Sequence, residues 1–120
     1  MAKTAAEKLT VARRLVDFAC NKHGLAQSDL MIDPLTFTIA TGNDEDRRLG
    51  LETLEGIRRI AETFPKCQIL LGLSNISFGL PARDGINSGF LTMAIASGMT
   101  SAITNPLHGD IVKACMAADV

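Results

Sequence analysis

The residues that could do chemistry in this 120-residue chain stand at the ends of three short apolar runs. The runs cover 29–32, 67–73 and 100–104, and the polar residues that follow them are Asp33, Ser74, Asn75 and Asn105. One carboxylate and two carboxamides offer hydrogen-bond acceptors and donors without concentrated charge. The alternative at each position is a simple turn, because Asp and Asn bond to nearby backbone and a following proline fixes φ.

The elements that must position these side chains are three strands and four helices in alternation. Apolar residues at helical spacing predict helices over 4–23, 43–63, 85–97 and 108–120. Thr4 and Asn43 are candidate N-caps, Gly24 and Gly98 are candidate C-caps, and the charges of the first helix are expected on its exposed side. Strands without polar alternation favour a parallel sheet covered on both faces, within one α/β domain over 1–120 with no internal boundary.

In a parallel sheet the carboxyl ends of successive strands meet at one edge, which is where α/β proteins bind ligands. Asp33, Asn75 and Asn105 are therefore expected to line one pocket. Such a pocket suits a neutral heterocycle rich in hydrogen-bonding groups, for example the fused aminopyrimidinone ring of a pterin.

Composition and motifs exclude several other classes of function. Twelve basic and 13 acidic residues give a net charge of −1, which offers no surface for nucleic acid. Phosphate-binding glycine motifs and metal-ligand spacings are absent. The three cysteines form neither a disulfide framework nor a zinc site, so a reducing, cytoplasmic setting is expected. No segment reads as a secretory leader or a membrane span.

Two longer motifs carry a family resemblance. GLSNISFGLPAR at 72–83 and MIDPLTFTIATG at 31–42 resemble the pterin-binding methyltransferases, and most closely the methyltetrahydrofolate:corrinoid-protein methyltransferases. The folate-binding domain of cobalamin-dependent methionine synthase is also similar. The resemblance spans roughly 28–120 and implies a partial (β/α)8 TIM barrel, its C-terminal portion, with about three parallel strands and flanking helices.

The resemblance also assigns roles to individual residues. It implies that Asp33 holds the pterin ring through its N–H groups and that Asn75 hydrogen-bonds N5 of methyltetrahydrofolate, which makes Asn75 the catalytic candidate. Further substrate-binding positions that it implies are Gly72, Ser74, Arg83, Asn87 and Asn105. The alternatives are strand packing for Gly72 and Ser74 and a solvated surface for Arg83.

The implied reaction moves the methyl group of methyltetrahydrofolate to the Co(I) corrinoid, a cobalamin, of a partner protein, and no metal need bind this chain. Dihydropteroate synthase shares the barrel, and in that family basic residues follow the last two strands. The corresponding segments here, 74–77 and 105–108, lack those basic residues, so this activity is the less favoured alternative.

A complete barrel takes about 250 residues, so the resemblance implies that other strands come from a separate N-terminal half or from a homo-oligomer. The alternative is a non-catalytic partial barrel or assembly subunit. Three strands alone would leave an apolar inner face exposed.

Overall fold

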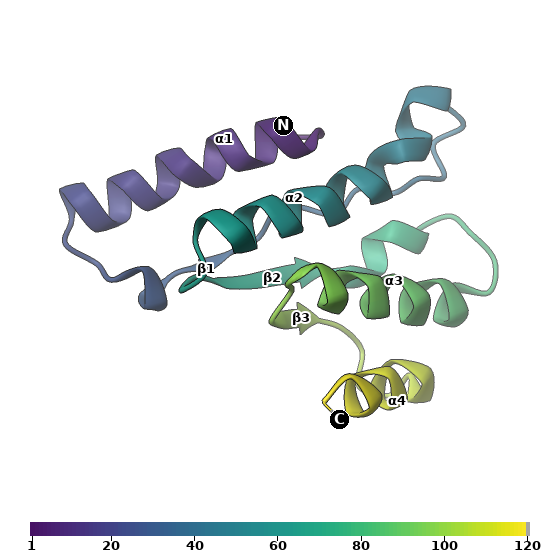
Figure 1. Cartoon of the computed structure of the whole chain (residues 1–120). Helices are drawn as coiled ribbons and strands as arrows, with labels where there is room; N and C mark the ends of the chain where they lie inside the picture. Colours follow the sequence, from purple (N-terminus) through teal and green to yellow (C-terminus); the bar gives the residue numbers. More distant parts are fainter. Residues whose placement is uncertain (120) are drawn as a thin grey trace.

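The computed structural model describes residues 1–119, which form a three-stranded parallel sheet with flanking helices (Figure 1). The α-helices are α1 (Ala5–Val16), α2 (Leu49–Thr63), α3 (Arg83–Ser97) and α4 (Gly109–Ala118). The strands are β1 (Met31–Ile32), β2 (Gln68–Gly72) and β3 (Ser101–Ile103), in the spatial order β1-β2-β3. The predicted α/β class and parallel sheet are therefore confirmed.

All three strands are shorter than predicted, and at two of them a 3₁₀ turn occupies residues that were expected to be extended. The turn Gln27–Asp29 precedes β1, and the turn Leu73–Ser77 follows β2 directly. In the register of the sheet, Met31 pairs with Gln68 and Gly72 pairs with Ile103.

The helix ends agree with the sequence in some places and differ in others. Thr4 Oγ1 accepts a hydrogen bond from the Glu7 amide at 3.2 Å, so the predicted N-cap of α1 is confirmed. Gly98, at φ 123°, ends α3 as predicted. The predicted cap at Asn43 is wrong: its side chain makes no capping bond, and a 3₁₀ turn at Asp44–Arg48 precedes α2.

The expectation that α1 keeps all its charges on the exposed side is also wrong. Its buried residues are Ala5, Lys8, Ala12 and Val16, whereas Leu15 is exposed. Lys8 therefore lies on the side of α1 that packs on α2, with its side-chain carbons next to Gly56.

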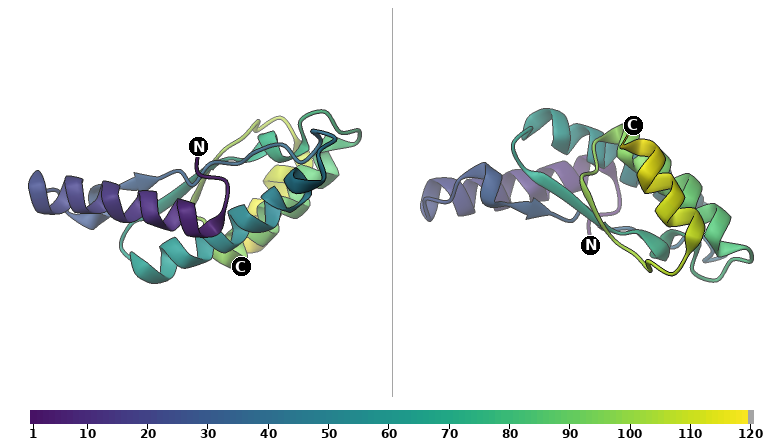
Figure 2. Two further views of the ribbon diagram at one scale, coloured as in Figure 1. Left: turned by 90° about the horizontal axis from the view of Figure 1, so that it is seen from above. Right: turned by 90° about the horizontal axis from the view of Figure 1, so that it is seen from below.

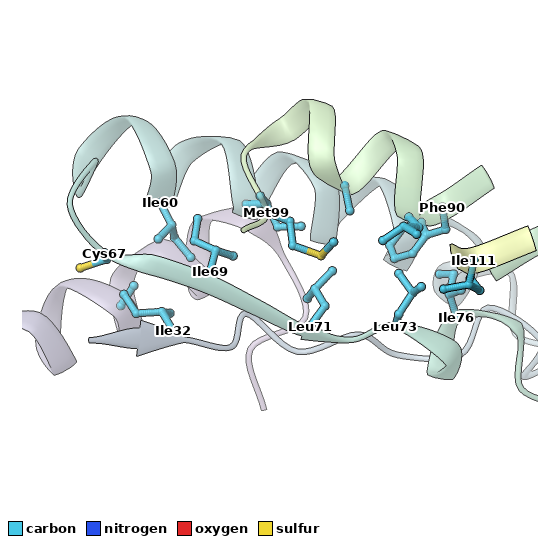
Figure 3. Close-up of a cluster of buried hydrophobic side chains, with 14 of the residues drawn as sticks. Ile32, Ile60, Cys67, Ile69, Leu71, Leu73, Ile76, Phe90, Met99 and Ile111 are labelled. Carbon is cyan, nitrogen blue, oxygen red and sulfur yellow. The ribbon is translucent and has the colours of Figure 1, made fainter. Parts of the chain in front are cut away.

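The core lies between the sheet and α2 and α3 (Figure 3). Ile69 and Leu71 of β2 and Leu73 just after it project toward these helices and are fully buried. Ile57 and Ile60 of α2 and Leu91 of α3 are among the buried residues of the same cluster. At roughly 1.5–3 kcal/mol per buried aliphatic side chain, this layer is the main source of stability in the chain.

The other face of the sheet is not covered by any part of 1–119, so the prediction of cover on both faces is wrong for this segment. We call it the open face, and it is formed by Met31, Gln68, Leu70, Gly72, Ser101 and Ile103. Met31 is 56% exposed and Ile103 is 65% exposed. The view from below shows β2 with no helix in front of it (Figure 2).

Candidate functional site

Asp33 begins a tight turn after β1. Its Oδ1 accepts a hydrogen bond from the amide of Leu35 at 2.8 Å, and the side chain is exposed. The turn-forming alternative is thus seen directly in the structure. The turn uses only one oxygen of the carboxylate, because Oδ2 of Asp33 makes no hydrogen bond within 1–119.

Asn75 lies in the 3₁₀ turn after β2, beside an empty position on the open face. A Cβ added at Gly72 would meet only one atom within 4 Å, the side-chain nitrogen of Asn75 at 4.0 Å. Nothing in the described chain therefore requires glycine there for packing. The absent side chain leaves room for a ligand to approach the backbone next to the Asn75 carboxamide.

The carboxamide of Asn75 is tied to the loop after β1. Its Nδ2 donates to the carbonyl oxygen of Thr36 at 3.4 Å. Its second N–H and its Oδ1 make no hydrogen bond to any described residue. The group can therefore donate one hydrogen bond and accept others from a ligand while it stays anchored.

A second group of candidate residues lines a cleft between α3, α4 and the ends of β2 and β3. The cleft has a volume of about 350 Å³. Its lining includes four of the seven predicted site residues, Ser74, Arg83, Asn87 and Asn105. Asp33, Gly72 and Asn75 lie outside it, and Asp33 lines a different pocket beside Lys8, so the described chain by itself does not bring Asp33, Asn75 and Asn105 into the one pocket that was expected.

Ser77 organises this cleft, although the sequence analysis did not select it. Its buried hydroxyl donates to Asn87 Oδ1 at 2.6 Å and accepts from Arg83 Nε at 3.0 Å. Another Arg83 nitrogen donates to the Ser74 carbonyl oxygen at 2.9 Å. The guanidinium is therefore tethered to the end of β2, while the residue itself stays exposed to solvent as the surface alternative expects.

Asp84 and His108 are further cleft residues that the sequence analysis did not select. Asp84 Oδ1 lies 3.1 Å from His108 Nδ1, which joins the start of α3 to the start of α4. Asn105 Oδ1 accepts from the Leu107 amide at 3.0 Å, so this asparagine also forms a turn. Asp84 and His108 could have been found from their positions in the sequence. Asp84 directly follows the predicted site residue Arg83, and His108 lies three residues after Asn105.

Residues 1–119 contain no group of three His, Cys, Asp or Glu side chains placed to hold a metal ion. In the same residues no helix is long and apolar enough to cross a membrane. The exposed polar groups are one carboxylate, several amides and hydroxyls, one tethered guanidinium and an imidazole paired with a carboxylate.

The carboxyl edge of this parallel sheet carries amides and a carboxylate, groups that can form hydrogen bonds with a polar heterocycle, and comparison with known proteins shows the family to which such a sheet belongs. Residues 1–105 match the family model described as pterin binding enzyme. The chain therefore belongs to the family of pterin-binding enzymes, as its motifs predicted. All seven predicted site residues lie inside the matched range.

Similar proteins carry names that refer to methyl transfer or to methionine. The chain is 47% identical over 106 residues to methionine synthase of Mycobacterium tuberculosis (strain ATCC 25618 / H37Rv), which covers 87% of the chain and 9% of that protein. It is 45% identical to methionine synthase of Mycobacterium leprae (strain TN), with the same coverage.

A third relative is much shorter than the methionine synthases. The chain is 38% identical over 116 residues to methylcorrinoid:tetrahydrofolate methyltransferase of Eubacterium limosum, which covers 97% of the chain and 41% of that protein. The chain thus spans less than half the length of each of these relatives.

Proposed function

We propose that this chain is the C-terminal part of a pterin-binding (β/α)8 barrel and forms one segment over 1–120 without an internal boundary. With the remaining strands it takes part in methyl transfer between N5 of tetrahydrofolate and the corrinoid of a partner protein. The observation that carries this proposal is the Asn75 carboxamide beside the vacant side-chain position of Gly72.

Asp33 is the proposed anchor of the pterin ring. A carboxylate accepts two N–H groups from the edge of an aminopyrimidinone, and the Oδ2 atom of Asp33 is available for this. Ser74 and Asn105 supply further polar contacts at the neighbouring strand ends, and Arg83 and Asn87 hold the cleft beside them.

Asn75 is the proposed catalytic residue. N5 of tetrahydrofolate leaves with the electron pair of the broken N–C bond and takes up a proton from solvent to become an amine, because an amine anion is too basic to leave unaided. The free N–H of the carboxamide donates to N5 as the carbon–nitrogen bond breaks, so it stabilises the transition state more than the ground state. The corrinoid, which a partner protein carries, supplies the cobalt that exchanges the methyl group.

The direction of transfer does not alter this role. Forward and reverse transfer pass through the same transition state, so a donor to N5 accelerates both. The name of the Eubacterium limosum relative gives methylcorrinoid as the methyl donor, whereas our proposal from the sequence gives methyltetrahydrofolate. The residues of this chain serve either direction.

The open face supports the barrel part of the proposal. Met31 and Ile103 expose apolar surface at opposite edges of the sheet, and the interior of a (β/α)8 barrel is filled by such side chains from all eight strands. Packed strands on this face would also explain why β2 reads as apolar on both sides. An N-terminal barrel half, or further copies of the chain, would cover this face.

Two other functions have less support. A non-catalytic assembly subunit would use only the open face, as a contact surface, and would give the Asn75 carboxamide no role. A dihydropteroate synthase-like reaction must neutralise a pyrophosphate, yet the guanidinium of Arg83 already bonds Ser77 and Ser74, and His108 faces Asp84.

Calorimetric titration with methyltetrahydrofolate separates these functions. We expect binding when the chain is mixed with an N-terminal half, such as the corresponding part of the Eubacterium limosum relative. An Asp33→Ala variant should lose that binding, whereas Glu45→Ala, which removes an exposed carboxylate of the turn Asp44–Arg48, should keep it. Absence of binding in every mixture would favour the non-catalytic subunit.

A further inference from the structure

Lys8 is a buried lysine whose ammonium group contacts the loop that carries Asp33. The residue is 3% exposed. Its Nζ donates hydrogen bonds to the carbonyl oxygens of Pro34, Leu35 (3.0 Å) and Ala2 (3.0 Å). All three ammonium hydrogens are therefore matched to backbone acceptors, and two of these acceptors belong to one turn.

The turn that Lys8 contacts holds an unfavourable backbone conformation. Leu35 has φ 67°, in the left-handed region that a residue with a β-carbon adopts at a cost of about 1 kcal/mol or more. Such a residue persists only where several contacts fix it. The contacts here are the Leu35 amide to Asp33 Oδ1, the Leu35 carbonyl to Lys8 Nζ and the same carbonyl to Thr53 Oγ1 at 3.2 Å.

The turn also connects the two groups that the proposed function uses. The Asp33 carboxylate lies at its start, and the Thr36 carbonyl that anchors Asn75 lies at its end. A shift of the segment from 33 to 36 would move both groups together.

Gly56 of α2 gives Lys8 its path to the turn. A Cβ at Gly56 would lie 2.7 Å from Lys8 Cδ, which is closer than such contacts allow. Only glycine leaves room for the lysine stem to pass between α1 and α2. Thus three elements, α1, α2 and the loop after β1, are built around one side chain.

From this geometry we infer that Lys8 is a positioning residue, which holds the left-handed turn at Leu35 and thereby places Asp33 and Asn75 for the pterin. The placement of Asp33 and Asn75 is relevant only if the proposed function holds, but the effect of Lys8 on the turn does not depend on it. Burial lowers the pKa of Lys8, and the nearby carboxylates of Asp33, Glu52 and Glu7 oppose that effect.

Backbone NMR of the chain tests the positioning role directly. Lys8→Met keeps the apolar stem and removes the ammonium, and Lys3→Met removes an exposed lysine of the same segment as a control. We expect Lys8→Met to abolish the strong intraresidue HN–Hα NOE that a positive φ gives at Leu35. The β2 amides should keep their exchange protection, and Lys3→Met should change neither signal.

A second substitution separates positioning from general stability. Glycine adopts the left-handed region freely, so Leu35→Gly should restore the shifts of Asp33 and of the Asn75 side-chain amide in the Lys8→Met background. If Lys8 only stabilised the fold, Leu35→Gly would weaken that variant further. Gly56→Ala should reproduce the Lys8→Met spectrum, whereas Gly89→Ala, with nothing within 4 Å, should not.

Two results would overturn the inference: an unchanged Leu35 NOE in Lys8→Met, or loss of that NOE together with the protection of β2. Pterin affinity is measured separately in the mixture with an N-terminal half. There we expect Lys8→Met to weaken binding on the order of tenfold or more, since small displacements of binding groups are costly. If the wild-type mixture binds no pterin, the proposed function fails while the NMR result still decides the role of Lys8.

Discussion

The side-chain nitrogen of Asn75 lies 3.4 Å from the carbonyl oxygen of Thr36, and this hydrogen bond joins two loops whose bonded residues are 39 positions apart. It connects the carboxyl end of β2 to the turn after β1. The position of the proposed catalytic amide therefore depends on the turn that carries Asp33. The two groups are expected to respond together to substitutions on either side of this bond.

The first prediction concerns Gly72. A Cβ there meets no atom nearer than the Asn75 amide at 4.0 Å, so Gly72→Ala should change the free energy of unfolding by only about 0.5 kcal/mol. The same methyl group would occupy the space proposed for the pterin. We expect unaltered thermal unfolding together with a clear loss of affinity in calorimetric titration of the mixture.

Gly89→Ala is the matched control for this substitution, because it adds a methyl group in open space on α3. Equal pterin affinities for the two alanine variants would show that Gly72 does not face the ligand.

The second prediction concerns the hydroxyl of Ser77. Ser77→Ala removes the donor to Asn87 Oδ1 and the acceptor for Arg83 Nε, and both of these residues line the cleft. A buried polar atom without its partner costs about 1–3 kcal/mol. Urea denaturation should show a loss of this size. Ser88→Ala, which removes only one long and exposed hydrogen bond, to the Asp110 carbonyl oxygen at 3.5 Å, should stay near the wild type. A similarly small loss for Ser77→Ala would contradict the network.

The third prediction concerns the contact between α2 and the end of α3. Gly98 has φ 123°, and a Cβ there would lie 2.7 Å from the Ala61 Cβ. Gly98→Ala should therefore lower the free energy of unfolding by at least roughly 1–3 kcal/mol, through backbone strain and overpacking. In the same urea experiment Gly89→Ala should be neutral or stabilising by about 0.5–1 kcal/mol. Equal midpoints for both variants would contradict this packing.

The fourth prediction concerns pH. Hydrogen bonds from Arg58 and then Arg59 lower the pKa of Glu55 from 4.5 to about 2. Between these values the unfolded chain binds the proton that the folded chain does not, so the stabilisation is complete above pH 4.5 and is lost as the pH falls toward 2. Glu55→Gln should flatten the pH dependence of stability in this window. An unchanged slope in Glu55→Gln would contradict the ion pairs.

Much of the fold could be predicted because the spacing of apolar residues and the residue types at helix ends depend directly on local structure. The interleaved apolar runs gave the parallel order of the strands, and Thr4 and Gly98 marked helix ends through local hydrogen bonds and backbone conformation. The cap at Asn43 could not be predicted in this way. Thr41 Oγ1 donates a hydrogen bond to Asp46 Oδ2 at 2.7 Å, within the segment where a 3₁₀ turn precedes α2. The spacing of apolar residues does not reveal such a contact.

The site was predictable in part for the same reason. Strand ends placed Asn75 and Asn105 at one edge, but no local rule shows that Ser77 ties Arg83 to Asn87 or that His108 faces Asp84. Lys8 shows the limit most plainly. Its charge predicted exposure, yet a glycine 48 positions away makes room for it, and backbone carbonyls from another loop satisfy it.

The central claim is that the carboxamide of Asn75 assists the departure of N5. Single-turnover methyl transfer to or from a corrinoid protein, in the mixture with an N-terminal half, measures this step directly. We expect Asn75→Ala to slow the transfer by on the order of 10²–10³-fold, as for the loss of one preorganised donor, while the affinity for methyltetrahydrofolate changes far less. An undiminished rate in Asn75→Ala would contradict the account.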